Sequence, residues 1–270
     1  MNSELLKKRF WDTIRPLHSP LTKAARKRLG RNYFDHPEMV LPPPYEAIQL
    51  EVERHLHRYL HVSAEEIEQV VIVGANDGGE IWRMRSAYPK SHFLCFEPSP
   101  QWYAQLKKDF GDVDFVESRE LALSDSAGTA TFHEMALAGN GSLLAPDVRQ
   151  WSEFCQTTAS EPQTFQVKVS TLEEEAVTLE KIDLLWVDVQ GAEGKVLAGG
   201  KTILSRVSAV FLEVWMARPP YEGGTIFADI NARLQEAGFS CVGLGLDSWN
   251  FTGNALWIRN LDDKVCKPIR

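Results

Sequence analysis

Short apolar runs alternate with amphipathic stretches over most of this chain, from Gln69 to Ile258. The runs around Val71 and Leu185 are almost continuously apolar, which is typical of strands covered on both faces of a parallel sheet. The amphipathic stretches between the runs have helical length and spacing. This pattern predicts an α/β fold with an open, doubly wound, mainly parallel sheet of seven strands. The predicted strands are Val70–Val73, His92–Phe96, Val113–Val116, Ile182–Val187, Val207–Val214, Phe239–Leu244 and Ala255–Ile258, and the predicted helices are Glu80–Ala87, Gln101–Phe110, Glu193–Leu204 and Phe227–Ala237.

The segment before Ile182, over about residues 127–170, departs from this rhythm. Thr129–His133 and Thr164–Val169 alternate like antiparallel strands, and Ala138–Ser142 has the composition of a flexible turn. We therefore expect an inserted, β-hairpin-like segment that forms a lid or faces the substrate.

The first sixty residues are predicted to form a helical extension, 1–60, ahead of the main domain, 61–270. Glu4–Leu17 is amphipathic and flanked by basic residues, and a second basic cluster follows over Lys23–Arg31. Such a helix can meet anionic lipid, a lipid-linked substrate or an acidic partner. The same pattern fits a helix that packs on the domain and keeps its charges in water, which we favour. It also offers an element for homodimerisation.

Charge and composition exclude several classes of function. The formal net charge is -8, and because Met1–Phe34 holds nine basic residues against two acidic ones, the remainder is about 15 units negative. This argues against nucleic-acid binding, which needs Lys and Arg aligned on phosphates. No apolar run is long enough for a spanning helix, and no signal peptide is recognisable. The four cysteines are widely separated, as in a reduced, cytoplasmic protein without a disulfide framework: Cys95, Cys155, Cys241 and Cys266.

The candidate chemistry lies directly after the predicted strands, because ligands of open α/β sheets bind outside the carboxyl ends of the strands. Gly74–Gly78 follows the first strand. Gly74 permits a tight turn and close approach of a ligand, and Gly78 lets the next helix begin close by. Glu97 follows the second strand, about 20 residues further on, where a carboxylate can accept both hydroxyl groups of a ribose.

The remaining loops complete the pattern. Leu121–Asp125 follows the third strand and offers small and apolar residues to flank an adenine ring. Asp188–Glu193 and Glu213 follow the next two strands, so four acidic residues point to one edge of the sheet. Glu97 and Asp188 could each merely cap a helix, but the coincidence of all the loops favours an adenosine site.

The nature of the cofactor depends on Asn76. It stands where a dinucleotide-binding loop has its second glycine, the one that lets a pyrophosphate lie against the backbone. This argues against a nucleotide-dependent oxidoreductase. S-adenosyl-L-methionine, which has an adenosine and a sulfonium amino acid but no diphosphate, fits the loops better.

Six ordered motifs resemble those of the FkbM-type S-adenosylmethionine-dependent methyltransferases, over about residues 69–216. The most specific is the DVQGAE block with the helix that follows. The resemblance implies a Rossmann-like class I methyltransferase fold and O-methylation of a hydroxyl of a sugar, glycan or small natural product, with S-adenosylhomocysteine as product. The motifs are VGANDGG, CFEPSP, LALSD, STLEE, IDLLWVDVQGAEGKVLAGG and FLEVW.

The resemblance also assigns roles to residues. Gly74, Asn76 and Gly78 would face the methionine part of the cofactor, Glu97 would bind the ribose, and Leu123 would lie near the adenine. Asp188 and Gln190 would lie near the transferred methyl group. The full set of expected cofactor-binding residues is Gly74, Asn76, Asp77, Gly78, Glu97, Pro98, Ala122, Leu123, Ser124, Asp188, Val189 and Gln190.

Two positions depart from the family pattern. Ile72 stands where the family usually has an acid, and Trp186 stands where it usually has a lysine. The first change leaves the cofactor's ammonium without its usual partner, for which Asp77 or a later acid is a substitute. The two changes keep open a third hypothesis, a protein that binds the cofactor without turnover.

Methyl transfer to a hydroxyl needs a base within hydrogen-bond reach and an acceptor oxygen about 3 Å from the methyl group. Asp188 and Glu213 are the candidate bases, and His133 on the insertion is a third. Asp188, Glu213 and Glu193 could instead gather a divalent cation, although metal-free chemistry is favoured. The candidate substrate contacts, which ordinary loop chemistry explains equally well, are Asn140, Ser142, Arg218 and Tyr221.

Overall fold

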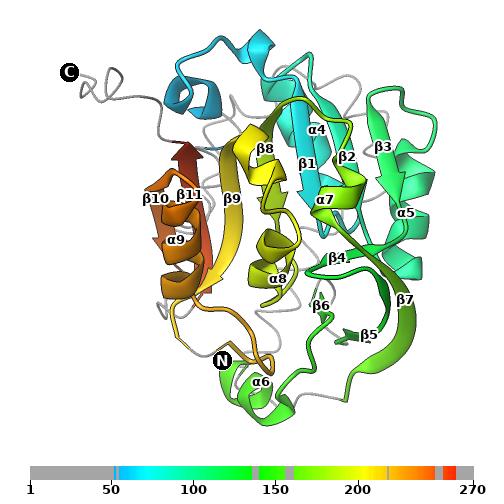
Figure 1. Ribbon diagram of the computed structural model, residues 1–270. Helices are drawn as coiled ribbons and strands as arrows, with labels where there is room; N and C mark the ends of the chain where they lie inside the picture. Colours follow the sequence, from blue (N-terminus) through cyan, green and yellow to red (C-terminus); the bar gives the residue numbers. More distant parts are fainter. Residues whose placement is uncertain are drawn as a thin grey trace, which may run out of the picture. The chain divides into compact units, whose positions relative to one another are not determined.

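A seven-stranded sheet forms the centre of the fold. The computed structural model describes residues 52, 55–135, 140–155, 161–217, 219–246 and 252–259. The sheet order is β10-β11-β9-β8-β1-β2-β3, and only the two pairs that include β11 are antiparallel. The prediction of a seven-stranded, mainly parallel sheet is therefore confirmed (Figure 1). Its strands are β1 (Gln69–Val73), β2 (His92–Phe96), β3 (Val116–Arg119), β8 (Ile182–Val187), β9 (Val207–Trp215), β10 (Phe239–Leu246) and β11 (Thr252–Arg259).

Helices cover both faces of this sheet, so the strands bury both sets of alternating side chains. On one face, α4 (Gly79–Ala87) and α5 (Pro100–Phe110) pack on β1 and β2 together with the helical residues 55–59. The helices on the other face are α7 (Leu172–Glu175), α8 (Glu193–Ala198) and α9 (Phe227–Glu236).

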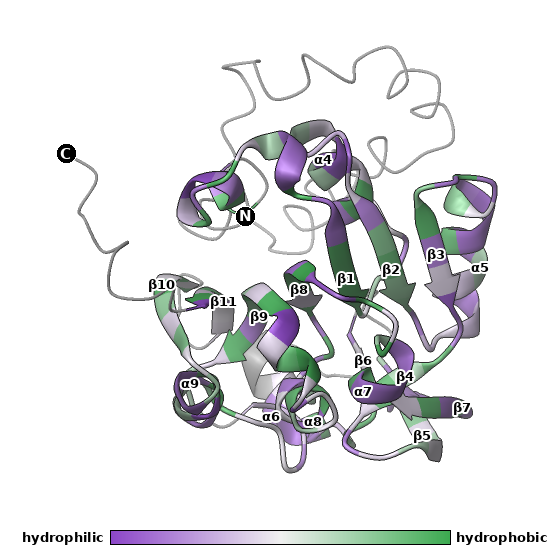
Figure 2. Cartoon of the chain, turned by 45° about the horizontal axis from the view of Figure 1, so that its top comes forward, coloured by the Kyte–Doolittle hydropathy of each residue, from purple (hydrophilic) through white to green (hydrophobic). Residues whose placement is uncertain are grey.

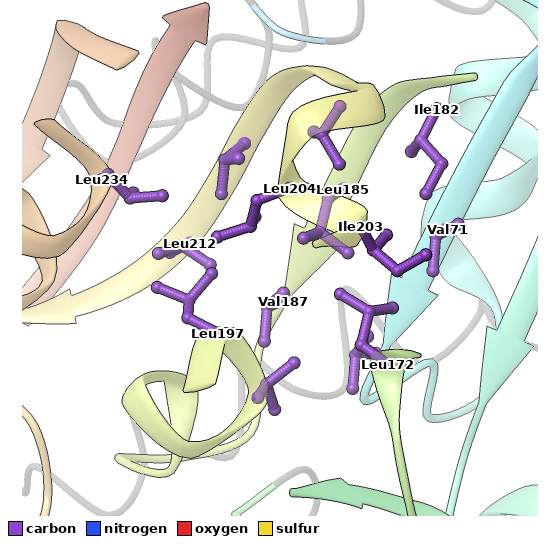
Figure 3. Packing of buried hydrophobic residues seen from close by; sticks show 14 of the residues in the cluster. Val71, Leu172, Ile182, Leu185, Val187, Leu197, Ile203, Leu204, Leu212 and Leu234 are labelled. Carbon is purple, nitrogen blue, oxygen red and sulfur yellow. The ribbon is translucent and has the colours of Figure 1, made fainter. Parts of the chain in front are cut away.

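The core on this second face is mainly aliphatic. Val71 of β1, Leu185 of β8 and Leu212 of β9 meet Leu197 and Leu234 from the helices (Figure 3). Figure 2 shows the same layering by hydropathy, with largely apolar strands and helices that mix apolar and polar residues. The apolar runs that predicted the strands therefore form two cores, one on each side of the sheet.

The insertion forms a second sheet, with the order β4-β7-β5-β6. β5 pairs antiparallel with both β6 and β7, as the alternating pattern predicted. This sheet and α6 lie at the end of the main sheet toward which β1 and β9 point, which is its carboxyl edge (Figure 1). The elements of the insertion are β4 (Ala122–Ser124), β5 (Gly128–Glu134), β6 (Gly141–Ser142), α6 (Val148–Cys155) and β7 (Gln163–Thr171).

Three predicted elements are wrong by three or more residues at one or both ends, and one of them is the strand predicted at Ala255–Ile258, which begins at Thr252. The third strand is Val116–Arg119, not Val113–Val116, because Val113 lies in the turn after α5 and its N–H donates to the carbonyl of Phe110. The predicted helix Glu193–Leu204 ends at Ala198, and η3 (Ile203–Arg206) follows as a separate 3-10 turn. The chain turns at Gly199, where a Cβ would collide with the carbonyl oxygen of Ser124.

Among the described residues, no helix is long and apolar enough to cross a membrane. Within the predicted helical extension 1–60, the described residues 52 and 55–59 are helical. The basic helix predicted at Glu4–Leu17 and the cluster at Lys23–Arg31 lie outside the described residues. Their roles in membrane contact and dimerisation stay predictions.

Candidate active site

Five positions, one from each of five neighbouring strands or the loop directly after it, form a row across the carboxyl edge of the main sheet. Asn254 of β11 pairs in register with Glu213 of β9. Asp188, Gly74 and Glu97 directly follow Val187, Val73 and Phe96, which are register partners of one another and of Leu212. Successive residues alternate between the faces of a sheet, so we expect these five positions to share one face. We call Asn254, Glu213, Asp188, Gly74 and Glu97 the edge row; at about 4.8 Å per strand it spans roughly 19 Å.

A second row lies two residues further into the sheet and contains only apolar residues or cysteine. Trp186 pairs in register with Ile72 on one side and with Phe211 on the other. We call Leu256, Phe211, Trp186, Ile72 and Cys95 the inner row; all five are at most 4% exposed. The ring centroids of Trp186 and Phe211 are 4.3 Å apart. The edge row is therefore bordered, on the side toward the centre of the sheet, by apolar side chains.

Gly74 begins the first loop of the site and needs to be glycine for two reasons. Its φ is +85°, and a Cβ there would collide with the carbonyl oxygen of Asp188. The N–H groups of Gly74 and Ala75 both donate to the carbonyl of Phe96, at 2.9 and 3.0 Å. The loop is thus held against β2 and β8, and Gly74 leaves the edge row without a side chain between Asp188 and Glu97.

Glu97 joins the first two loops. One carboxyl oxygen, Oε2, accepts the N–H of Asn76 at 2.8 Å, and the other, Oε1, accepts the N–H of Ser99 at 2.8 Å. The side chain is 5% exposed. Each carboxyl oxygen keeps capacity for another hydrogen bond, as a ribose diol needs.

Asp77 and Gly78 organise the start of α4. Oδ1 of Asp77 accepts the N–H of Gly79 at 3.0 Å. Gly78 has a φ of +78° and directly precedes the helix, and a Cβ there would overlap Phe110 and Leu106 of α5. Gly78 therefore lets α4 begin close to α5.

Gln190 connects the two acids of the edge row that lie farthest from Glu97. Its Nε2 donates to Oδ1 of Asp188 at 2.8 Å and to Oε2 of Glu213 at 3.0 Å. The Tyr221 hydroxyl donates to Gln190 Oε1 at 3.0 Å. Both amide hydrogens and the amide oxygen are used, so this network fixes the orientation of the amide and the spacing of the two carboxyl groups.

Glu193 holds the loop on which Gln190 stands. Its Oε1 accepts the N–H groups of Val189 and Gly191 at 3.1 and 3.2 Å, and its side chain is fully buried. Glu193 therefore positions the loop from inside the protein, and its second oxygen, Oε2, is buried without a hydrogen-bond partner among the described residues.

Burial dominates the electrostatics of these four acids. It raises the pKa of Glu97 and of Glu193 to about 7, although backbone N–H groups partly oppose the effect. Desolvation raises the pKa of Asp188 to about 6, against the hydrogen bond from Gln190. Burial, with the neighbouring charges of Asp188 and Glu193, raises the pKa of Glu213 well above its ordinary value. The site therefore favours a cationic ligand, which would relieve the repulsion among the ionised carboxyls.

The insertion contacts both sides of the edge row. The hydroxyl of Ser99, beside Glu97, donates to Glu134 of β5 at 2.9 Å. The Ser142 hydroxyl donates to the carbonyl of Val189 at 3.3 Å. Pro146 and Tyr221 also form an isolated antiparallel β-bridge. These contacts support the prediction that the insertion faces the site.

An apolar cluster lies where the insertion meets the loops after β8 and β9. Trp151 and Trp215 each pack edge-on to Tyr221, at ring centroid distances of 5.6 and 6.4 Å. The whole cluster is Met135, Leu144, Trp151, Ala192, Trp215 and Tyr221. It holds the Tyr221 hydroxyl beside Gln190.

The other predicted residues lie in varied surroundings. His133 is on β5 opposite Ser142, and the carbonyl of Asn140 accepts the N–H of Met135 at 3.3 Å. Leu123 packs in the aliphatic core, and its neighbours Ala122 and Ser124 are buried in β4. The adenine contact of these three and the Pro98 contact stay predictions. Arg218 lies outside the described residues.

Comparison with known proteins identifies the family. The sequence model of the methyltransferase FkbM domain matches residues 73–241, more than half of the chain. The chain belongs to the FkbM methyltransferase family. This confirms the resemblance seen in the motifs and the prediction of an enzyme that transfers methyl groups.

Two relatives support this FkbM assignment, and one solved structure shares the fold. The 2-O-methyltransferase NoeI of Sinorhizobium fredii (strain NBRC 101917 / NGR234) is 32% identical over 180 residues, 62% of this chain and 72% of the relative. Methyltransferase sdnD of Sordaria araneosa is 31% identical over 195 residues, 63% and 73% of the two chains. The METTL16 methyltransferase domain (crystal form 2) shares the fold, with a TM-score of 0.50 at 9% identity over 89% of this chain and 80% of that one. The oxidoreductase and non-catalytic alternatives lose support.

The two departures from the FkbM pattern are neighbours. Ile72 and Trp186 are register partners in the inner row, so they replace an acid and a lysine at adjacent positions on one face of the sheet. An isolated acid at Ile72 would be a buried charge facing Trp186. The acid and the lysine of the family pattern would therefore be adjacent, and both are absent from this FkbM chain.

Sequence reasoning missed Glu134, Trp151 and Asn254. Only the register of β11 against β9 brings Asn254 beside Glu213, and only the path of the insertion brings Glu134 to Ser99. No local motif marks either residue. An alignment of FkbM sequences would be the signal to examine.

Proposed function

We propose that this chain is an S-adenosylmethionine-dependent O-methyltransferase that methylates a hydroxyl group of a sugar, a glycan or a small natural product. The observation that carries the proposal is the network in which Gln190 holds Asp188 and Glu213 side by side at the carboxyl edge. It places two carboxyl groups where a hydroxyl can be oriented and deprotonated.

The loops fit the cofactor. Glu97 is buried at the end of β2 with both oxygens turned to the loop N–H groups, so it can also accept the ribose hydroxyls. Gly74 leaves the space beside it free of a side chain, and Asn76 and Asp77 shape the turn for the methionine part. The excess of buried carboxyl groups favours a sulfonium and an ammonium group over a diphosphate. When bound, S-adenosylmethionine supplies an electrophilic methyl group.

The relatives support the choice of acceptor. NoeI is named a 2-O-methyltransferase, which indicates a hydroxyl as methyl acceptor for that protein. The polar groups of the edge row can hold such a hydroxyl, since carboxylates accept its proton and Gln190 fixes their separation. A hydroxyl acceptor therefore agrees with both the family and the site.

Asp188 is the base that the site supports best. Its pKa of about 6 leaves it ionised near neutral pH, whereas Glu213, with its pKa raised well above the ordinary value, holds a proton more readily. Asp188 would accept the hydroxyl proton, and Glu213 would orient the acceptor. Tyr221 and Gln190 act as positioning residues.

His133 and a divalent cation remain alternative predictions. Among the described residues, no group of three or more His, Cys, Asp or Glu side chains is arranged to hold a metal ion. Activity that is lost after dialysis against EDTA and restored by Mg²⁺ would support the cation. A cytoplasmic location also stays a proposal, supported by the free thiols of Cys95 and Cys241.

Calorimetry tests the cofactor first. We expect S-adenosylmethionine and S-adenosylhomocysteine to bind and NAD not to bind. Glu97→Ala should abolish measurable binding, while Glu120→Ala, at an exposed carboxylate outside the site, should leave it unchanged. Binding of NAD alone would contradict the proposal. Methylation of a panel of hydroxyl acceptors, followed by mass spectrometry, then tests turnover.

A further inference from the structure

The side-chain amide nitrogen of Asn254, Nδ2, is buried. The residue is 4% exposed, and its Nδ2 meets no acceptor in the described part of the chain. It stands near the start of β11, the antiparallel strand of the main sheet, directly opposite Glu213. The Cβ atoms of such a pair lie about 4.5–5.5 Å apart on the same face. Asn254 therefore forms the end of the edge row beyond Glu213.

The lack of a partner at this place has a physical cost. An amide buried without a hydrogen bond costs about 1–3 kcal/mol, so native proteins seldom keep one without a use. An apolar residue at position 254 would avoid this cost, and Leu256, two residues further along β11, is such a buried apolar residue. A donor kept at the edge row next to a carboxyl group indicates that a ligand provides the missing acceptor.

A donor beside a carboxyl group matches one chemical group well. A hydroxyl oxygen can accept from Nδ2 of Asn254 while its proton is donated to Glu213 or another acceptor. Glu213 is fixed on its other side by Gln190, which also holds Asp188. Asn254 is thus two strands, about 10 Å along the sheet, from the base. This distance places it at a second hydroxyl of the acceptor, not at the methylated one.

We propose that Asn254 is a substrate-binding residue that recognises a second hydroxyl group of the acceptor and so selects polyhydroxylated, sugar-like molecules. This inference rests on the proposed function and adds the chemical class of the acceptor to it. In this proposal the end of the edge row at Glu97 binds the cofactor, and the end at Asn254 binds the acceptor. The wild-type site should therefore discriminate against an acceptor that lacks this hydroxyl.

The test compares Asn254→Leu, which removes the amide but keeps the branching of the side chain, with Asn254→Asp, which removes the donor. Asn231→Asp is the matched control, since Asn231 lies on α9 and its Oδ1 accepts from Trp257, a role that a carboxylate keeps. The probes are methyl glycopyranosides and their monodeoxy analogues. Both Asn254 variants should raise KM for the best glycoside about 10-fold or more, and leave S-adenosylmethionine affinity within about 2-fold. The control should match the wild type.

The deoxy analogues separate recognition from a structural role. One monodeoxy glycoside should be a poor substrate for the wild type and should lose nothing further in Asn254→Leu, because the variant no longer reads that hydroxyl. Equal effects of Asn254→Leu on every analogue, or an unchanged KM, would overturn the inference.

Thermal unfolding gives a readout that needs no acceptor. Removing an unsatisfied amide should leave the Tm of Asn254→Leu equal to or above that of the wild type. A Tm lower by several degrees would show that the amide holds the fold, and would overturn the inference even if no glycoside were methylated. Wild-type failure to bind S-adenosylmethionine or to methylate any acceptor would instead contradict the proposed function.

Discussion

The edge row and the inner row are two residues apart on the same five strands, yet they are built on opposite principles. The edge row keeps three carboxyl groups, an amide and a glycine at the ends of the strands. The inner row is apolar apart from a cysteine thiol, and Trp186 with Ile72 and Phe211 fills its centre. Desolvation is the largest cause of the raised pKa values of the edge-row acids. Burial therefore sets the chemistry at the edge of the sheet.

The largest expected effect comes from neutralising the base of the edge row. Asp188→Asn should lower kcat by about 10²- to 10⁴-fold, because the hydroxyl proton would lose its acceptor. Single-turnover kinetics with saturating S-adenosylmethionine would measure it. Asp112→Asn, at an exposed acid in the turn after α5, is the control and should keep full activity. An Asp188→Asn variant with more than half of the wild-type kcat would assign the base elsewhere, with Glu213 and His133 next to be tested.

The inner row can be broken by introducing charge. Ile72→Glu should lower the free energy of unfolding by about 3–5 kcal/mol, since it buries a carboxylate against Trp186. Ile72→Val, which removes one methylene group, should cost only about 0.5–1.5 kcal/mol. Urea unfolding would measure both.

A double-mutant cycle sharpens this result. Trp186→Lys combined with Ile72→Glu would recreate the acid and lysine of the family pattern at adjacent positions. We expect the double variant to be about 1–3 kcal/mol more stable than the sum of the single effects predicts. Strict additivity would show that the two residues do not compensate for each other.

The raised pKa values predict a stability that falls with rising pH. Glu97 and Glu193 have a pKa of about 7 in the folded protein, above the ordinary value of 4.5, so the folded state binds more protons than the unfolded state between these values. Their contribution to the free energy of unfolding therefore decreases as the pH rises from about 4.5 to 7. One unit of pKa corresponds to about 1.4 kcal/mol.

Glu97→Gln is the variant that isolates this effect. The difference in Tm between wild type and variant should shift in favour of the variant between pH 5 and pH 8, in the absence of cofactor. S-adenosylmethionine, as a cation, should stabilise the wild type more at pH 8 than at pH 5. Parallel pH profiles for the two proteins would mean that the pKa of Glu97 is not raised in the folded protein.

The smallest expected effect concerns the Tyr221 hydroxyl. Tyr221→Phe removes its hydrogen bond to Gln190 but keeps the ring contacts with Trp151 and Trp215. The lost bond is worth about 0.5–1.5 kcal/mol, so kcat should fall by about 2- to 10-fold. Tyr103→Phe, whose hydroxyl donates to the carbonyl of Ser118 away from the site, is the control. An unchanged kcat in Tyr221→Phe would remove Tyr221 from the positioning network.

The sequence predicted what depends on local pattern. Buried parallel strands are nearly all apolar, so β2 and β8 were placed with their observed bounds. The strand at Val113 was misplaced because β3 is an edge strand, whose partly exposed residues lack a clear apolar run. The helix after Glu193 was predicted too long. The contact between Gly199 and Ser124 is a tertiary contact, which the local pattern does not show.

Features that depend on pairing could not be predicted. The positions of Gly74, Glu97 and Asp188 at one edge were predictable, because each residue directly follows a parallel strand. The pairing of Ile72 with Trp186 could not be predicted, because one sequence does not show the register of its strands. The sequence alone therefore presents the two residues as independent departures from the family pattern. Asn254 carries no motif, so only its register with Glu213 reveals it.

The edge row takes each of its members from a different strand or the loop directly after it. A substitution at Asn254 can therefore alter the recognition of the acceptor while Glu97 and Gly74 keep their hold on the cofactor. Because of this separation, single substitutions can change the acceptor-binding end of the edge row during evolution. Relatives with the same cofactor loops and a different residue opposite Glu213 would then be specialised for different acceptors.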